Sequence, residues 1–349
     1  MSSQQGVEHS PYVRAFACHR CGQMLFVENH TCLRCGSAVG LDARVLDVVL
    51  LDTDVLQRCS GFGAVTCPWL VPTATGGRCP SCALVRRTPV DLSGDQGEQL
   101  ATTLAALRRL VFQLLSLGLP TTLASGPLVL DLPSGSEEPV TIGHADGVIT
   151  LDVGEADVVH REEVRVQLAE PYRTVLGHPR HEYGHAVWDT LVVDDDGSLA
   201  RCRELFGDDT LDYAAELDRH YAQGPPPDWQ ERHVSAYATM HPYEDWAETF
   251  AHYLHLRAVL QTAEAYGVLV TGPTTPAPLA DAEALEAAPH EHVDDEPFED
   301  VLGTWLPLVY ALNGLQRSMG QPDLYPFVLA PGVVEKLAFV HGRVAARRG

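Results

Sequence analysis

The sequence predicts an α+β protein in which a small cysteine-rich domain precedes a larger, mostly helical domain with a small sheet. Three observations support this prediction. Eight of the nine cysteines fall between residues 18 and 82. Apolar residues at helical spacing dominate the rest of the chain, and only two short segments there have the β-branched character of strands. At roughly 150 residues per domain, the 349 residues suggest two domains, and we expect them to span 1–90 and 91–349.

The first four cysteines predict a structural zinc site. Cys18 and Cys21 in CHRCG, and Cys32 and Cys35 in CLRCG, form two CxxCG knuckles. Each knuckle turns tightly enough for two thiolates to face one ion, and the glycine after its second cysteine accepts the left-handed backbone of such a turn. Four thiolates complete a tetrahedral zinc site.

The next four cysteines have less regular spacing. Cys79 and Cys82 form a knuckle, whereas Cys59 and Cys67 are eight positions apart with glycines between them. We expect a second four-thiolate zinc site, with isolated buried thiols as the alternative. Cys202 is expected to be a small buried apolar residue. Because so short a segment buries little apolar area, we predict a zinc ribbon that depends on metal to fold.

The remaining elements follow from local patterns. Apolar residues at helical spacing predict helices, and short β-branched runs bounded by Gly, Pro or Ser predict strands. Proline is tolerated at a first helical position but ends a helix elsewhere. In chain order we expect a helix over 99–117, strands over 127–133 and 147–153, helices over 157–170, around 181–185, and over 211–223, 229–240 and 242–260, and helices near 300–319 and 331–346. Residues 271–299, rich in Pro, Ala, Asp and Glu, predict a flexible acidic excursion.

The charge of the chain argues against a nucleic-acid partner. The formal net charge is -23; residues 1–90 hold eight Arg against six acidic residues, a net of +2, so the rest of the chain carries -25. Phosphate binding needs Lys and Arg to neutralise charge. The polar start lacks the apolar segment of a signal peptide, and no run approaches the roughly 18 apolar residues of a membrane span. We therefore expect a cytoplasmic protein without a membrane or nucleic-acid partner.

The stretch RHEYGHAVW contains an HExxH motif. His181 and His185 lie four residues apart on the expected helix and can face one ion, while Glu182 lies about 100° round the helix from His181. Two imidazoles bind zinc, and the adjacent carboxylate takes a proton from a water whose pKa the metal lowers to about 7. The motif predicts metal-assisted hydrolysis with Glu182 as the general base.

A second segment supplies the third ligand that a catalytic zinc needs. Glu244 and Glu248 lie four residues apart on the helix that begins near Pro242. We predict Glu244 as the ligand and Glu248 as the carboxylate that orients a ligand histidine through its other ring nitrogen. The exchange of these two roles is the alternative. His252 and His255, close to the same face, are expected to be packed or exposed rather than ligands.

Three segments resemble a known family: GHADGVITLDVGEAD, EPYRTVLGHPRHEYGH and YATMHPYEDWAETFAHYLH. Behind a double-knuckle ribbon, they resemble a bacterial family of zinc-binding metallopeptidases, over residues 16 to 266. The core is also similar to that of the glutamate-zincins, in particular the anthrax lethal factor protease domain, which implies a zincin-like fold. In that domain a tyrosine stands seven residues before the ligand glutamate, as Tyr237 stands before Glu244 here.

The resemblance has two further implications. Tyr237 would donate a hydrogen bond to the oxyanion that forms as the scissile carbonyl becomes tetrahedral, with core filling as the alternative. The strand GVITLDV would be the sheet edge along which an extended peptide substrate lies.

Our functional hypothesis is a zinc metallopeptidase that acts on a peptide or protein substrate. It would hold one catalytic zinc and one or two structural zinc ions. The alternative is a non-catalytic, zinc-containing protein-interaction module on the same scaffold. Glu182 favours the enzyme, because a metal site without catalysis has no need of that carboxylate.

Overall fold

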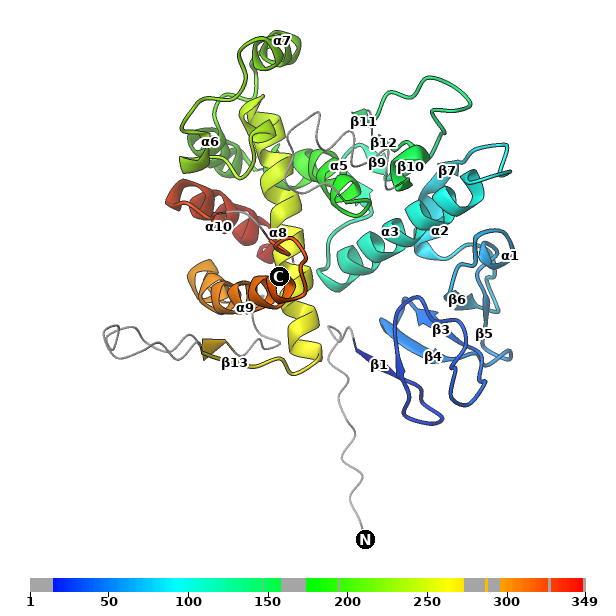
Figure 1. Cartoon of the computed structure of the whole chain (residues 1–349). Coiled ribbons are helices and arrows are strands. Elements are labelled where there is room, and N and C mark those ends of the chain that lie inside the picture. The colour runs from blue at the N-terminus through cyan, green and yellow to red at the C-terminus, as the bar shows by residue number, and fades with distance from the viewer. Residues whose placement is uncertain are drawn as a thin grey trace.

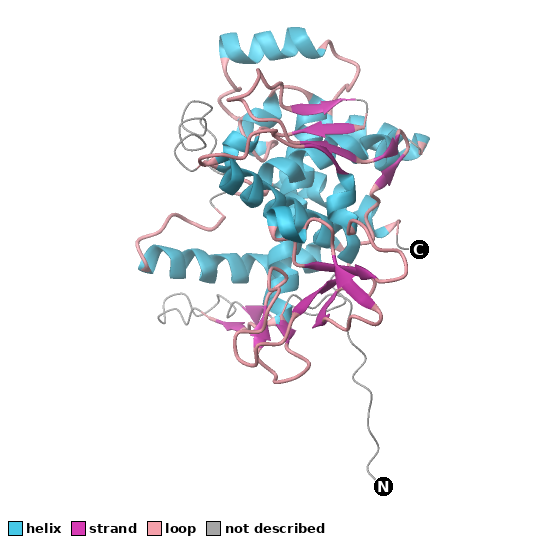
Figure 2. Ribbon diagram, turned by 90° about the vertical axis from the view of Figure 1, so that its right-hand side faces the viewer, coloured by secondary structure: helices cyan, strands magenta, loops and turns pink. Residues whose placement is uncertain are grey.

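The protein is an α+β molecule in which a small amino-terminal region of short strands lies beside a larger helical body (Figure 1), and this confirms the predicted fold class. In Figure 2 the strands form several small, separate sheets around the helices. This computed structural model describes residues 15–145, 147–157, 174–193, 195–272, 286–287, 296–325 and 328–347.

The amino-terminal region is built on a hairpin and a four-stranded sheet. Its elements are β1 (Phe16–Ala17), β2 (Met24–Leu25), β3 (Val39–Asp42), β4 (Asp47–Leu50), β5 (Leu56–Arg58), α1 (Phe62–Val65), β6 (Trp69–Pro72) and α2 (Pro80–Leu84). The larger sheet has the order β4-β3-β6-β5. Leu41, Val48 and Trp69 are fully buried among the cysteines, so a small apolar core accompanies the cysteine clusters.

Two elements connect this region to the helical domain. One is α3 (Gln96–Ser116), whose Phe112 packs edge-on against Phe16 of the ribbon with ring centroids 6.1 Å apart. The other is β7 (Val85–Arg87), which follows α2 and pairs with β10 (Val129–Asp131) of the second domain. The ribbon is therefore packed against the helical domain through side chains and a shared sheet.

The second domain contains one small mixed sheet. Its other strands are β11 (Gly143–Ala145) and β12 (Val148–Thr150), and the order is β11-β12-β10-β7. β12 runs parallel to β10 and antiparallel to β11. The expectation that GVITLDV forms the sheet edge is wrong, because Gly147, with φ of +76°, turns the chain so that β11 covers β12. Among the described strands, β11 forms this edge of the sheet and β7 forms the opposite edge.

Helices form most of the rest of the domain. Those described are the short η1 (Val153–Ala156), α5 (Gly177–Trp188), a π-helical turn η2 (Asp189–Val193), α6 (Asp196–Phe206), α7 (Tyr213–Gln223), the 3-10 turns η3 (Trp229–Glu231) and η4 (Tyr237–Thr239), α8 (Pro242–Ala265), α9 (Phe298–Ser318) and α10 (Pro331–Ala345). Two hairpins complete the set: β8 (Thr122–Leu123) with β9 (Gly126–Pro127), and β13 (Val270–Thr271) with β14 (Glu286–Ala287). The helices predicted at α3, α5, α7, α8, α9 and α10 are confirmed.

One predicted helix is wrong. Residues 229–240 form the two 3-10 turns η3 and η4, joined by bends. The hydroxyl of Ser235 accepts a hydrogen bond from the backbone N–H of Ala238 at 3.1 Å. Such a local side-chain bond competes with the helical pattern. The predicted helix at 157–170 and most of the 271–299 excursion lie outside the described residues.

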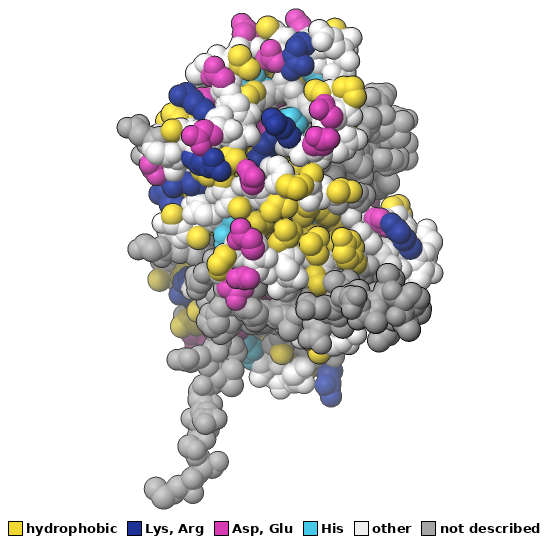
Figure 3. All heavy atoms as spheres, turned by 90° about the vertical axis from the view of Figure 1, so that its left-hand side faces the viewer, with side chains coloured by type: hydrophobic (Ala, Val, Ile, Leu, Met, Phe, Trp, Pro, Cys, Tyr) yellow, Lys and Arg dark blue, Asp and Glu magenta, His cyan; other side chains and the backbone are white. Residues whose placement is uncertain are grey.

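None of the described helices combines the length and apolar character needed to span a bilayer. Figure 3 views the molecule from the side of β13 and α9, where hydrophobic side chains gather near the middle of the face. A cavity of about 580 Å³ lies there between residues 268–272 and the α9 residues 307–315. The side chains of Leu269, Tyr310 and Leu315 are among those that remain exposed.

Candidate metal centre

Two helices supply the predicted metal ligands. His181 and His185 lie on α5, and Glu244 lies in the first turn of α8. Figure 1 shows these two helices packed against each other. At their closest approach, a Cβ added to Gly184 would lie 3.0 Å from the Cα of Ala247 and 3.2 Å from its carbonyl oxygen. The glycine within HEYGH therefore lets α8 come close enough to reach the histidines.

The side chains of His181, His185 and Glu244 converge on one point. The Nε2 atoms of the two histidines lie 3.0 Å apart, and Oε2 of Glu244 lies 3.0 Å from the first and 3.2 Å from the second. Ligands at zinc bond lengths of about 2.0–2.1 Å in a tetrahedron are about 3.3 Å apart. Two imidazoles and one carboxylate are also a donor set that catalytic zinc uses. These residues fit zinc in both spacing and chemistry.

Glu248 and Ser235 hold His181 in one orientation. Nδ1 of His181 donates to Oε1 of Glu248 at 2.7 Å, and the Ser235 hydroxyl donates to Oε2 at 2.6 Å. Burial would raise the pKa of Glu248, but the hydrogen bond and charge of His181, together with His252 and Ser235, outweigh burial and lower the pKa to about 2. With its proton on Nδ1, His181 directs the lone pair of Nε2 towards the point between the three ligand atoms, where it could bind zinc.

Glu244 is 3% exposed and ionised. Burial would raise its pKa, but the neighbouring His185 and His181 hold it well below the usual value. Its second oxygen, Oε1, accepts a hydrogen bond of 2.8 Å from the hydroxyl of Tyr213 on α7. Tyr213 thus fixes the carboxylate with Oε2 facing the imidazoles.

Glu182 lies beside the ligands and is 5% exposed. Its Oε1 is 3.1 Å from Nε2 of His178. Its Oε2 is buried, and no group in the described part of the chain hydrogen-bonds to it. Burial would raise the pKa of Glu182, but the hydrogen bond from His178 and the nearby imidazoles lower it overall. An ionised carboxylate with one unengaged oxygen is suited to accept a proton.

Tyr237 lies on η4, with its ring centroid 6.1 Å from that of His181. Burial raises the pKa of its hydroxyl above the ordinary value, so the group stays protonated and can donate a hydrogen bond. This position is compatible with the oxyanion role and with core filling, and the role of Tyr237 stays a prediction.

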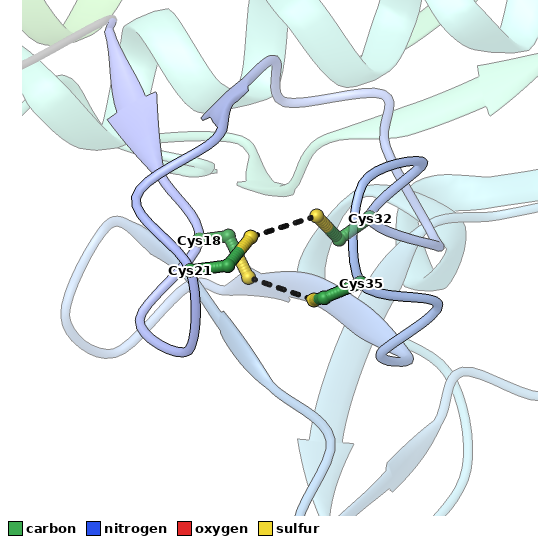
Figure 4. A group of neighbouring side chains, drawn as sticks. All are labelled: Cys18, Cys21, Cys32 and Cys35. Atoms are coloured by element: carbon green, nitrogen blue, oxygen red, sulfur yellow. Dashed lines mark hydrogen bonds between the residues drawn. The ribbon is translucent and has the colours of Figure 1, made fainter.

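The first four cysteines form one cluster (Figure 4). The sulfur of Cys18 lies 3.7 Å from that of Cys35, and the sulfur of Cys21 lies 3.6 Å from that of Cys32. Four thiolates at about 2.3 Å from zinc in a tetrahedron are about 3.8 Å apart, so the cluster fits zinc. The glycines after Cys21 and Cys35 both have φ of +70°, which confirms the predicted left-handed turns.

The second quartet also forms one cluster, despite its irregular spacing. The sulfurs of Cys67 and Cys79 lie 3.7 Å apart, and the backbone N–H of Cys79 donates to the sulfur of Cys59 at 3.2 Å. A Cβ on Gly61 would lie 3.2 Å from the sulfur of Cys82. The glycine between the first two cysteines therefore leaves room for four sulfurs around one ion.

Three other predicted positions are also described. His252 and His255 are buried on α8, outside the metal-ligand groups found in the described residues. Nδ1 of His252 pairs with the hydroxyl of Tyr325 at 2.8 Å, so this histidine belongs to the packing between helices. Cys202 is 1% exposed on α6, as predicted for a small buried apolar residue.

Sequence reasoning missed four residues around the site: His178, Glu155, Tyr213 and Ser235. The position of His178, four residues before Glu182 on the same helix, was a signal that could have found it. Glu155 lies on η1, Tyr213 on α7 and Ser235 between η3 and η4, and no local spacing points from them to the motif.

Comparisons with known proteins identify the family of the chain. A family described as "Putative zinc-binding metallo-peptidase" matches residues 96–343, and a zinc-ribbon domain family matches residues 15–93. The chain is 44% identical over 335 residues to uncharacterized proteins of Mycobacterium bovis and of two strains of Mycobacterium tuberculosis, and the alignment covers 94% of each chain. No solved structure matches the chain, so the likeness to the lethal factor domain stays a prediction. The chain belongs to the family described as "Putative zinc-binding metallo-peptidase", with a zinc ribbon at its amino-terminal end.

Proposed function

We propose that the protein is a zinc-dependent peptidase whose general base is Glu182. One observation carries the proposal: α5 and α8 bring His181, His185 and Glu244 to within bonding distance of a single cation, with Glu182 buried beside them. The sheet, the two helices and the ribbon are compatible with other functions, whereas this set of groups is specific to metal-assisted hydrolysis.

Each residue has a distinct role in the proposed reaction. Zinc held by the three ligands would acidify a water molecule and polarise the scissile carbonyl. Oε2 of Glu182 accepts the proton of the attacking water, because it is the oxygen that His178 leaves unengaged. The same carboxyl group then passes the proton to the leaving amine nitrogen. Tyr237 donates a hydrogen bond to the developing oxyanion.

The edge strand β11 offers a place for the substrate. Strand addition to an open sheet edge aligns an extended peptide through main-chain hydrogen bonds. β11 packs near α5, the helix that carries the two histidines. In this proposal β11, and not β12, pairs with the peptide.

The test replaces one carboxylate oxygen of Glu182 with an amide nitrogen. We expect Glu182→Gln to reduce cleavage of an internally quenched peptide library by about 10²–10⁴-fold, because the amide cannot accept the proton. Zinc per chain should stay unchanged, because Glu182 is not a ligand. Glu204→Gln, the same chemical change at an exposed position on α6, is the control and should cleave like the wild type.

Cleavage by Glu182→Gln at the wild-type rate would contradict the mechanism. Absence of any cleavage by the fully zinc-loaded wild type would contradict the proposal that the protein is a peptidase. That second result would favour the non-catalytic interaction module.

A further inference from the structure

A buried chain of three side chains leads away from Glu182. His178 lies one helical turn before it on α5, and its Nε2 is 3.1 Å from Oε1 of Glu182. Nδ1 of the same ring is 2.6 Å from Oε2 of Glu155, on η1. The side chains of His178 and Glu155 are only 15% and 11% exposed. Neither residue is a metal ligand, and the reaction described above needs neither of them directly.

The chemistry of the three groups fixes the direction of the hydrogen bonds. Both ring nitrogens of His178 face carboxylate oxygens, so both donate when each carries a proton. Burial would lower the pKa of His178, but the hydrogen bonds and charges of Glu155 and Glu182 raise it to about 9. At neutral pH the ring is therefore a cation that donates to a carboxylate on either side.

We propose that His178, held by Glu155, is a positioning residue that fixes the carboxylate of Glu182 for proton transfer. The proposal rests on the role of Glu182 as the base. A glutamate side chain has several rotatable bonds, and a general base must lie within hydrogen-bond reach of the proton it takes. The bond from His178 to Oε1 removes that freedom and leaves Oε2 as the oxygen that accepts the proton.

Glu155 ties this arrangement to the rest of the fold. It lies on η1, which directly follows β12 of the small sheet, and η1 packs against α3. The base on α5 is thus braced against the sheet whose edge strand is β11. The orientation of Glu182 therefore depends on an element separate from its own helix.

Two variants of His178 separate positioning from packing. The side-chain amide of glutamine reproduces a donor at Nε2, whereas that of asparagine reproduces a donor at Nδ1. We expect His178→Gln to stay within a few fold of the wild type on the best-cleaved peptide of an internally quenched library. His178→Asn should lower kcat by about 100-fold with little change in KM, because the base is misplaced by about 1 Å while the binding surface is intact.

Zinc per chain and the thermal midpoint should be equal in the two variants. Equal kcat values for His178→Gln and His178→Asn would overturn the proposal, and so would a change confined to KM. In both cases an inactive Glu182→Gln variant would still support the proposed peptidase with Glu182 as its base. Loss of zinc in His178→Asn alone would also overturn it, because the effect would then act through the metal site.

A spectroscopic measurement tests the contact with Glu155 without any substrate. In ¹⁵N-histidine-labelled, zinc-loaded protein, the Nδ1–H proton of His178 should give a strongly downfield resonance, because it lies in a short bond to a carboxylate. The resonance should vanish in His178→Gln, move upfield in Glu155→Gln and persist in Glu182→Gln. A wild-type spectrum without it would overturn the role of Glu155.

Discussion

Glu244 is a single carboxylate that contacts three side chains at the centre of the site. Its Oε2 faces His181 and His185, and its Oε1 accepts the Tyr213 hydroxyl. A buried charge of this kind needs a cation or a set of donors to offset the cost of desolvation. The spacing of the three ligand atoms and the match to the family both favour zinc as that cation.

At the same scale, Glu244 and Glu248 can be told apart by substitution. Glu244→Gln should release the catalytic zinc and leave the cysteine-bound zinc in place, because it removes a charged ligand. Glu248→Gln should keep the catalytic zinc but weaken its affinity by about 10–100-fold, because it only orients His181. Zinc per chain, measured after dialysis against graded chelator concentrations, gives both values. The reverse pattern would mean that the two carboxylates have exchanged roles.

At the scale of elements, the site depends on how closely α5 and α8 pack. The sequence predicts both helices, because helical spacing and the proline at the start of α8 are local signals. It cannot predict the contact at Gly184, which depends on Ala247 across 63 positions of chain. The sequence does not predict the order of the strands for the same reason, since β12 lies inside the sheet only because β11 pairs with its outer edge.

Gly184→Ala tests this packing. The added methyl would meet the backbone of Ala247 at about 3 Å, so we expect a loss of about 1–3 kcal/mol in the free energy of unfolding and weaker zinc binding as α8 moves away. Gly342→Ala, on α10 with open space around the new methyl, is the control. This variant should leave zinc binding unchanged. It should raise the free energy of unfolding by at most about 1 kcal/mol, because alanine has a higher helix propensity than glycine. Unaltered zinc affinity in Gly184→Ala would contradict the importance of the close approach.

On the scale of the whole molecule, the carboxy-terminal helix braces the site. Lys336, the single lysine of the chain, lies on α10 and is buried. Its ammonium donates to Oδ2 of Asp245 at 2.5 Å and to the carbonyl oxygen of Arg232 at 2.6 Å. Asp245 adjoins Glu244, and Arg232 lies in the segment that leads to Ser235. One side chain therefore joins α10 to both segments that bring carboxylates and tyrosine to the metal centre.

Removal of this ammonium should be costly. Lys336→Met leaves the carboxylate of Asp245 buried without its main partner, so we expect a loss of about 3–5 kcal/mol in the free energy of unfolding. Arg201→Met, which breaks an exposed ion pair with Glu204, is the control and should stay within about 0.5 kcal/mol of the wild type. Chemical denaturation followed by circular dichroism measures both. Equal stability of the two variants would contradict the bracing role of α10.

The ribbon and the helical domain differ in how much of each can be predicted from the sequence. The knuckles Cys18–Cys21 and Cys32–Cys35 can be recognised because each ligand pair is local. The second cluster is less obvious from its spacing, because the tertiary fold and a glycine beside the sulfurs bring its cysteines together. His178 and Glu155, which support the base, are 23 positions apart, and no sequence pattern predicts the contact between them.

Anomalous diffraction from crystals of the zinc-loaded protein, measured on both sides of the zinc absorption edge, is the most direct test of the metal centre. We predict three peaks, one within each cysteine cluster and one about 2.0–2.2 Å from Nε2 of His181, Nε2 of His185 and a carboxylate oxygen of Glu244. Peaks in the two cysteine clusters with none between the histidines and Glu244 would contradict the proposed zinc peptidase.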